Sequence, residues 1–219
     1  MRVVGIDLSG PKNHRDTVLM VFEAADSQLR FIKCRNHMSD EEILKEIADQ
    51  SQLDEVVIGI DAPLSYEDGG GDRESDRALR KFIVELGMKP GSIMAPTFNR
   101  MVYLTLRGIR LSREIERQAS SNPVSIVEVH PGAVIGSRLS SIEMNDVLTY
   151  KQDLQVRKAL LPWFEQQQLI GIPDTAAEQT HAIDACAAAL GAWHWGDHTC
   201  TPKWRYAAKP PLHPYDFCC

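Results

Sequence analysis

Short apolar runs rich in β-branched residues alternate along the chain with segments of helical spacing, which is the pattern of an α/β protein. A polar stretch at 25–28 separates the second apolar run from the third and predicts a hairpin. The run at 55–61 has no charge in its middle, which is typical of a strand covered on both faces. The expected strands are residues 2–8, 17–22, 29–35, 55–61 and 124–129.

Ser39 is followed by Asp40, Glu41 and Glu42, so we expect an N-cap with acidic residues in the first helical turn. An amphipathic helix then follows from this cap. Four prolines and little periodicity at the end of the chain predict an extended tail. The other expected helices are residues 73–86, 97–118, 151–168 and 180–195.

The first, fourth and fifth strands are separated by helical crossovers, so we expect them to be parallel, with the hairpin strands antiparallel. This order predicts a mixed α/β sheet with helices on its faces. We expect one domain over residues 1–201, a helical insertion at about 66–120, and the tail at 202–219.

The charge balance is acidic, since 24 basic and 30 acidic residues give a formal net charge of −6 over 219 residues. Such a balance argues against a generic nucleic-acid binder, which would usually be basic. The five cysteines form no CxxC pair, and neither a signal peptide nor a membrane span is readable. We therefore expect a cytoplasmic protein without a membrane partner.

Two predicted strands end in the same tripeptide, Gly-Ile-Asp, at Asp7 and at Asp61. If these strands are parallel neighbours, both carboxylates meet in the crevice where α/β sheets bind ligands. Two unpaired carboxylates repel each other, and a divalent ion such as Mg²⁺ or Mn²⁺ removes the conflict. The alternative is that each aspartate only caps a turn.

Two further acids are expected near this point. Asp184 belongs to a helix that is apolar nearly all round, where a carboxylate is costly unless it is paired or metal-bound. His181 lies on the same helical face. Glu128 interrupts an apolar strand, and it either completes the acidic cluster or forms a salt bridge with an arginine.

These residues resemble the RNase H-like superfamily and its RuvC-type resolvases. In finer detail they resemble one branch, the predicted nucleases long catalogued as a domain of unknown function, number four hundred and twenty-nine. The matching segments are residues 5–10, 59–65, 73–80, 128–131 and 181–185.

The resemblance implies a five-stranded sheet of order 3-2-1-4-5 and a Mg²⁺-dependent phosphodiester hydrolase, with Asp7, Asp61 and Asp184 as metal ligands. Two positions depart from RuvC-type enzymes, which usually carry glutamate where Asp61 stands and often a second acid where His181 stands.

On this hypothesis Asp7 bridges two ions about 3.5–4 Å apart, and Asp61, Asp184 and Glu128 complete the shell. His181 or His130 moves a proton, because histidine titrates near neutrality. Ser9 or Ser65 orients a phosphate of the substrate.

The predicted insertion carries ten basic and six acidic residues between 72 and 117, a net charge of 10 − 6 = +4. Arg73, Arg77 and Arg80 share one helical face that suits phosphate binding, and Asp76 lies within it. The alternative is a solvated helix with internal ion pairs. Lys151 is either a further phosphate contact or a surface lysine.

Two other functions stay open. An actin-like phosphotransferase also begins with an aspartate on a strand, but the chain is short for its two lobes. An RNase H-like fold that has lost its metal site would act as a binding or scaffold protein. The substrate is DNA, RNA, a junction or a nucleotide, and the oligomeric state is open, a homodimer included.

Overall fold

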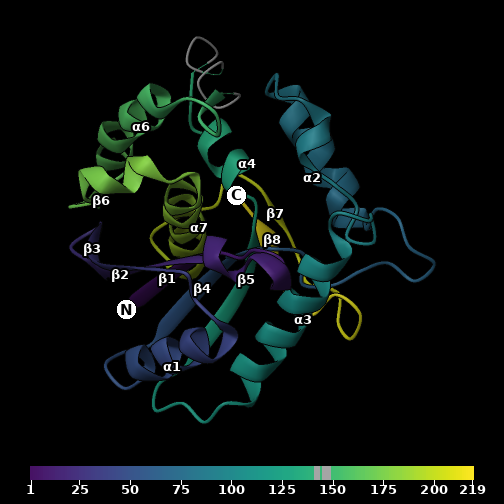
Figure 1. Ribbon diagram of the computed structural model, residues 1–219, viewed down its shortest axis with the longest axis horizontal. Helices are drawn as coiled ribbons and strands as arrows, with labels where there is room; N and C mark the ends of the chain where they lie inside the picture. Colours follow the sequence, from purple (N-terminus) through teal and green to yellow (C-terminus); the bar gives the residue numbers. More distant parts are fainter. Residues whose placement is uncertain (141–143, 145–148) are drawn as a thin grey trace.

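The computed structural model describes residues 1–140, 144 and 149–219. The strands in this part of the chain are β1 Arg2–Asp7, β2 Val18–Ala25, β3 Gln28–Asn36, β4 Val56–Asp61, β5 Val124–Val129, β6 Leu169–Ile170, β7 Arg205–Tyr206 and β8 Phe217–Cys218. They form one mixed sheet in the order β6-β3-β2-β1-β4-β5-β8-β7 (Figure 1). β1, β4, β5 and β8 are parallel to one another, whereas β2 is antiparallel to both of its neighbours.

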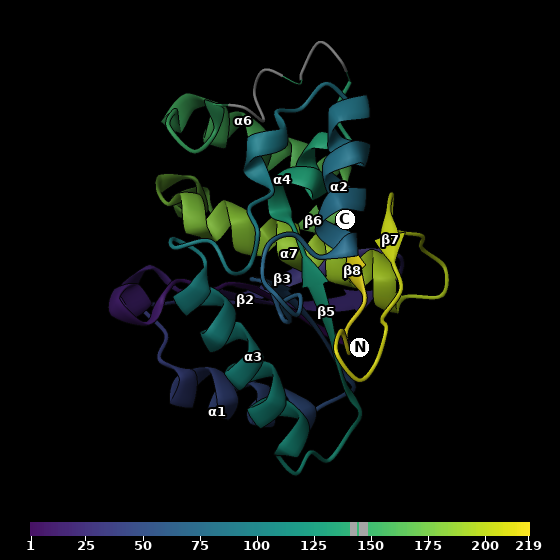
Figure 2. The same ribbon diagram turned by 90° about the vertical axis from the view of Figure 1, so that its right-hand side faces the viewer.

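Helices cover both faces of this sheet (Figure 2). The α-helices in the described part of the chain are α1 Asp40–Ser51, α2 Glu74–Glu85, α3 Val102–Arg117, α4 Pro131–Gly136, α6 Leu154–Gln166 and α7 Thr180–Gly196. Short 3-10 helices span Pro11–Asp16, Pro90–Ser92 and Asp174–Glu178. The α1 and α3 side of the sheet forms one apolar core, and the side of α2, α4, α6 and α7 forms a second and larger one.

Several local predictions are confirmed. Asp26 and Ser27 adopt positive φ angles of 54° and 58° in the tight turn between β2 and β3, which is the predicted hairpin. Ser39 caps α1 in a reciprocal capping box, in which its hydroxyl accepts from the Glu42 amide and its amide donates to the Glu42 carboxylate. The mixed α/β sheet with flanking helices is also as expected.

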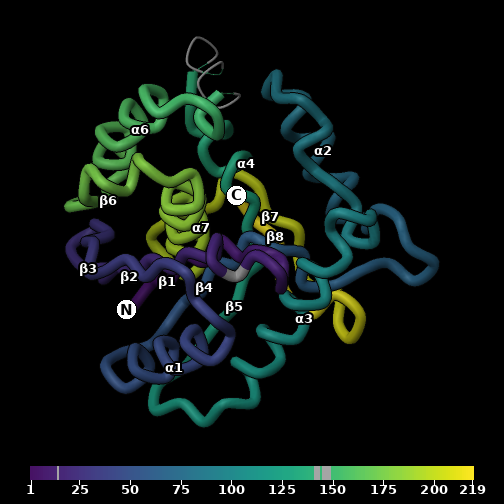
Figure 3. Tube along the Cα trace, in the orientation of Figure 1, coloured from purple at the N-terminus to yellow at the C-terminus, as the bar shows by residue number. Residues whose placement is uncertain are grey.

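The prediction of five strands is wrong, because the sheet has eight. The three additional strands, β6, β7 and β8, are two residues long each, too short to show an alternating pattern. Two of them lie in the segment at 202–219, where an extended tail was expected. Figure 3 shows this segment turning back beside β5, with which β8 pairs.

The parallel pairing of β1 with β4 brings the ends of two strands together. Its register places Gly5 opposite Gly59 and Asp7 opposite Asp61. Ligands of open α/β sheets bind at the carboxyl ends of such strands.

Among the described helices, none combines the length and apolarity that crossing a membrane requires.

Candidate metal centre

Three carboxylates converge at this edge of the sheet. Asp7 ends β1, Asp61 ends β4, and Asp184 faces them from the first turns of α7. Each offers one oxygen, and these three oxygens all lie within 4.8 Å of one another. Among the described residues, no other group of three histidine, cysteine or acidic side chains is so arranged. The structure thus brings together the three predicted metal ligands.

The close approach of α7 to the sheet depends on the glycine that precedes each strand-ending aspartate by two residues. A Cβ atom at Gly5 would lie 1.9 Å from the backbone oxygen of Ala185, and one at Gly59 would lie 2.3 Å from that of Ala188. No side chain fits into such a gap, so only glycine lets the helix backbone rest on β1 and β4. The Gly-Ile-Asp repeat therefore serves helix packing and places Asp184 beside the two strand ends.

The surroundings of the triad disfavour negative charge. Burial raises the pKa of Asp7, the hydrogen bond from His181 opposes this rise, and the Asp184 carboxylate adds to it. Burial, followed by repulsion from Asp7 and Asp184, raises the pKa of Asp61 well above its usual range. Like charges in a desolvated site produce this pattern, and a bound cation relieves it.

Two basic side chains border the triad. His181 Nδ1 lies 2.6 Å from Asp7 Oδ2, and this hydrogen bond raises the pKa of His181 despite its partial desolvation. Lys151 Nζ lies 3.1 Å from Asp184 Oδ2, although its side chain is 60% exposed. Desolvation would lower the pKa of Lys151, but the triad's carboxylates outweigh it and the net shift is upward. Lys151 thus belongs to the site, in a turn ahead of α6 rather than at the start of that helix.

Tyr150 is a site residue that the sequence reasoning missed. It is 1% exposed, and its hydroxyl donates to Asp184 Oδ1. Burial and the Asp184 carboxylate raise the pKa of Tyr150 well above its usual range, so the phenol keeps its proton. Nothing local in the sequence marks this tyrosine, because its partner lies 34 residues away.

The donor set fits a hard divalent cation. Mg²⁺ and Mn²⁺ prefer oxygen ligands, and three carboxylates from three elements provide them. A cavity of about 240 Å³ adjoins the triad and is lined by Asp7, Asp61, His130 and Lys151 among others, which leaves room for a ligand. Among the described residues, three carboxylates face two basic side chains, Lys151 and His181, so a bound cation would offset the remaining negative charge.

Glu128 lies outside the triad and forms the salt bridge that was the alternative. Its two carboxylate oxygens accept from Arg73 at 2.6 and 2.8 Å, and one of them also accepts from the Leu64 amide at 2.9 Å. All three side chains of the Glu128, Arg73 and Asp76 group are nearly fully buried. Their contacts join the segment before α2 to the end of β5.

Arg73 has no donor left for a phosphate. Its five N–H groups are directed at Asp76, Glu128 and Ser65. Arg73 precedes α2 as its N-cap residue, and Asp76 accepts from the Arg73 amide in return. The structure therefore places Arg73 and Asp76 in an internal network.

The two other arginines of the predicted phosphate face bind their own loop. Arg80 forms a two-point ion pair with Asp72 at 2.6 and 2.9 Å, and it also donates to the carbonyl oxygen of Ile93. Arg77 is exposed and donates to the carbonyl oxygen of Asp72 at 2.6 Å. This arrangement corresponds to the alternative of internal ion pairs.

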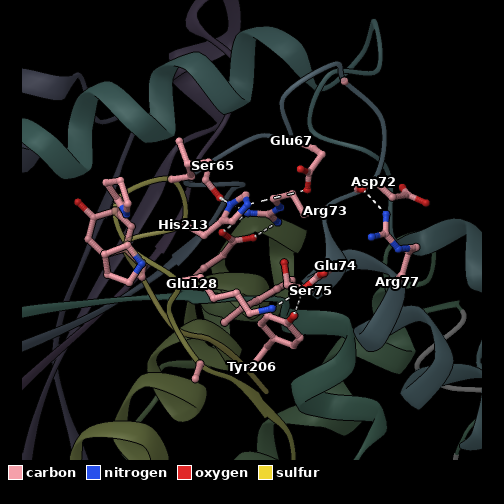
Figure 4. Close-up of a pocket in the computed structure, with 18 residues that line it drawn as sticks. Ser65, Glu67, Asp72, Arg73, Glu74, Ser75, Arg77, Glu128, Tyr206 and His213 are labelled. Carbon is pink, nitrogen blue, oxygen red and sulfur yellow. Dashed lines mark hydrogen bonds and ion pairs between the residues drawn. The ribbon is translucent and has the colours of Figure 1, made fainter.

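The remaining predicted residues, Ser9, His130 and Ser65, lie outside the triad and have other partners. Ser9 Oγ donates to the Asn13 carbonyl oxygen at 2.5 Å and lies 2.8 Å from Thr17 Oγ1. His130 caps α4 by accepting from the Ala133 amide, and burial lowers its pKa, so it is held neutral. Ser65 lies between Arg73 and His213 on a second cavity, as Figure 4 shows.

Comparison with known proteins places most of the chain in one family. The model of that family, described as "Protein of unknown function (DUF429)", matches residues 5–206. No curated protein matches the chain.

Proposed function

The chain belongs to the DUF429 family of proteins of unknown function, and on this premise we propose that it is a metal-dependent phosphodiester hydrolase with an RNase H-like fold, acting on nucleic acid or a nucleotide. The order of the five longer strands within the sheet, β3-β2-β1-β4-β5, supports this fold assignment. So does the position of the acids at the ends of β1 and β4 and on the helix that packs across them.

One observation carries the proposal: three aspartate oxygens from β1, β4 and α7 lie within 4.8 Å of one another in surroundings that disfavour their negative charge. Buried carboxylates are normally paired or hold a metal ion. Three neighbouring carboxylates without a bound cation would destabilise the fold. A metal site gives this arrangement a function.

Asp7, Asp61 and Asp184 would hold Mg²⁺ or Mn²⁺, one ion or two. When bound, such ions make a water molecule nucleophilic at neutral pH and stabilise negative charge on the oxygens of a phosphodiester.

The bordering side chains position and balance the acids. His181 donates through Nδ1 to Asp7 and holds that carboxylate in place, while its ring remains 41% exposed at the edge of the site. Tyr150 donates to Asp184 and fixes that carboxylate in the same way. Lys151 adds positive charge at the exposed rim, where an anionic substrate would approach.

Calorimetric titration with Mn²⁺ tests the proposal. We expect saturable binding to the wild-type protein and at least tenfold weaker binding to Asp61→Asn, which keeps the shape of the side chain and removes its charge. Asp49→Asn is the matched control, because Asp49 is exposed on α1. Equal binding to all three proteins, or none to the wild type, would count against the metal centre.

A binding or scaffold protein without a metal is the second candidate. It is favoured by the ion pairs that Lys151 and His181 make with two of the three aspartates, which supply part of the missing positive charge. The same titration separates the candidates, since a scaffold would show no carboxylate-dependent binding of Mn²⁺. Hydrolysis of oligonucleotides in Mg²⁺ buffer then distinguishes a nuclease from a protein that only binds the ion.

A further inference from the structure

A second and larger cavity, of about 750 Å³, lies next to the metal centre. It shares Arg73, Glu128 and Phe217 with the smaller cavity but contains none of the three aspartates. Its walls come from the loop after β4, the start of α2 and the C-terminal segment (Figure 4). A volume of this size is typical of small-molecule sites.

Three side chains in this cavity form a chain of contacts. Ser65 Oγ lies 2.9 Å from His213 Nδ1, and His213 Nε2 lies 3.9 Å from Glu67 Oε2. Ser65 and Glu67 follow the carboxyl end of β4, whereas His213 comes from the C-terminal segment, 148 residues after the serine. A hydroxyl, an imidazole and a carboxylate in this order are the parts of an activated nucleophile.

The contact between Ser65 and His213 activates the serine in one of the two histidine tautomers. With its proton on Nε2, the atom nearer to Glu67, His213 accepts from the Ser65 hydroxyl at Nδ1. The Arg73 guanidinium donates to Ser65 Oγ at 3.1 Å, so the serine oxygen lies beside a positive charge.

Both reacting side chains are held in place by backbone contacts. Leu64, which precedes Ser65, donates its amide to Glu128 at 2.9 Å. The backbone of His213 exchanges two hydrogen bonds with that of Lys209, at 2.7 and 3.1 Å. The hydroxyl and the imidazole thus come from two pinned segments, as a preorganised site requires.

We propose that Ser65 is the nucleophile of a second, metal-independent active site that hydrolyses small carboxylic esters, with His213 as its general base and Glu67 positioning the imidazole. Ser65 Oγ bonds to the ester carbonyl carbon as its proton passes to His213 Nδ1. The bond to the alcohol oxygen breaks, and that oxygen takes the proton. Water then attacks the acyl-serine, loses a proton to His213, and releases the acid with a regenerated Ser65 hydroxyl.

One part of the cavity wall suits the apolar part of such a substrate. The rings of Tyr206 and Phe217, with Pro210, Pro211 and Leu212, offer apolar contact for a compact acyl or alkoxy group. Lys209 and Glu74 form an ion pair at the wall, so neither presents an unmatched charge to a neutral ester.

Labelling by a fluorophosphonate probe in EDTA tests the nucleophile. The probe modifies activated serines, and mass spectrometry locates the modified residue. We expect modification of Ser65 and at least 100-fold slower labelling of His213→Gln, which is the usual contribution of a general base. Ser75 lines the same cavity and is the internal control. An unmodified Ser65, equal labelling of Ser75, or unchanged labelling in His213→Gln would overturn the proposal.

Hydrolysis of p-nitrophenyl acetate in EDTA tests the reaction. We expect turnover that Ser65→Ala abolishes and His213→Gln reduces at least 100-fold. His213 is partly exposed, so its variant remains informative even if the buried Ser65 variant does not fold. In Glu67→Gln we expect kcat to fall while KM stays the same, a split that a purely structural role would not cause. Labelling of Ser65 without histidine-dependent turnover would overturn the assignment of substrate class. Because EDTA removes divalent ions, these results are independent of the Mn²⁺ titration.

Discussion

Asp61 is surrounded by groups that disfavour its ionised form. Burial acts first, and the carboxylates of Asp7 and Asp184 add to it, so the pKa of Asp61 lies well above the ordinary value of 3.8. Neither of the bordering cations pairs with it directly, since His181 contacts Asp7 and Lys151 contacts Asp184. Asp61 therefore has the strongest need of a metal ion.

We expect Asp61→Asn to be more stable than the wild type at pH 7–8 in EDTA. A raised pKa means that the native state binds the proton more tightly than the unfolded chain, so the stability of the wild type falls as the pH rises from the ordinary value of 3.8 through the raised pKa. Asparagine does not titrate and escapes this loss. Thermal melting measures the difference, and about 1 kcal/mol corresponds to about 2–4 °C in a chain of this size.

The dependence on pH and on metal provides the control. Well below the ordinary pKa of 3.8 the wild-type carboxyl is protonated in both states, so the two melting curves should approach each other there. Mn²⁺ should raise the melting temperature of the wild type above that of the variant, because an ion that binds only the native state stabilises it. If the wild type is more stable than Asp61→Asn in EDTA at pH 8, the charge of Asp61 does not destabilise the native state.

The contact between α7 and the sheet decides where Asp184 lies. Gly5 and Gly59 are opposite each other in the parallel pair, and both face the small residues of α7. Twelve of the seventeen residues of α7 are buried, which explains its nearly uniform apolarity. Close packing of backbone on backbone is the structural condition for a triad drawn from two strands and a helix.

Gly5→Ala should therefore prevent stable folding or lower the melting temperature by more than 10 °C. The added Cβ would lie 1.9 Å from the Ala185 oxygen, a backbone atom that cannot move without shifting the helix. Gly10→Ala is the control, because a Cβ there would have no atom within 4 Å. Circular dichroism during heating measures both variants. Equal melting temperatures would contradict the close approach of α7 to β1.

The C-terminal segment at 202–219 completes the sheet and the second cavity. β8 pairs with β5, and Phe217, Cys218 and Cys219 are nearly fully buried. Asp216 accepts from the Trp195 indole at 2.7 Å and forms an ion pair with Arg205 at 2.6 Å. Much of one core and of the larger cavity therefore depends on residues with no visible strand pattern.

Removal of residues 202–219 should expose the edge of β5 and yield a protein that aggregates or melts at least 10 °C lower. An uncovered parallel strand presents unpaired backbone groups and apolar side chains to solvent. Leu212→Ser is the control for the same segment, because Leu212 is 61% exposed. Size-exclusion chromatography and thermal melting provide the comparison. A truncated protein as soluble and as stable as the Leu212→Ser variant would show that the segment is dispensable.

The positive charge of the predicted insertion was expected to bind phosphate, but several of its arginines have other partners. The insertion is basic, but its most buried arginines, Arg73 and Arg107, are committed to internal partners. Arg107, for example, donates to Asp40, to Thr17 and to the carbonyl oxygen of Ser9. Part of the positive charge of this segment thus joins elements to one another.

Local patterns were sufficient for the longer elements and for the three acids of the triad. Apolar runs mark β1, β4 and β5, and a buried acid in an apolar helix marks Asp184. These signals are readable because burial and chain periodicity act on neighbouring residues. The repeated tripeptide predicted that Asp7 and Asp61 meet, since parallel strands in register bring equivalent positions side by side.

Pairings between distant segments could not be read in this way. The sequence did not decide whether Glu128 binds a metal ion or forms a salt bridge. Its partner Arg73 is 55 residues away, and either role requires the same buried carboxylate. The partner of Tyr150, the two-residue strands and the contact of Ser65 with His213 depend likewise on how the folded chain brings remote segments together. Local sequence sets the preference of each segment for helix or strand, whereas contacts over long separations are set by the packing of the complete chain.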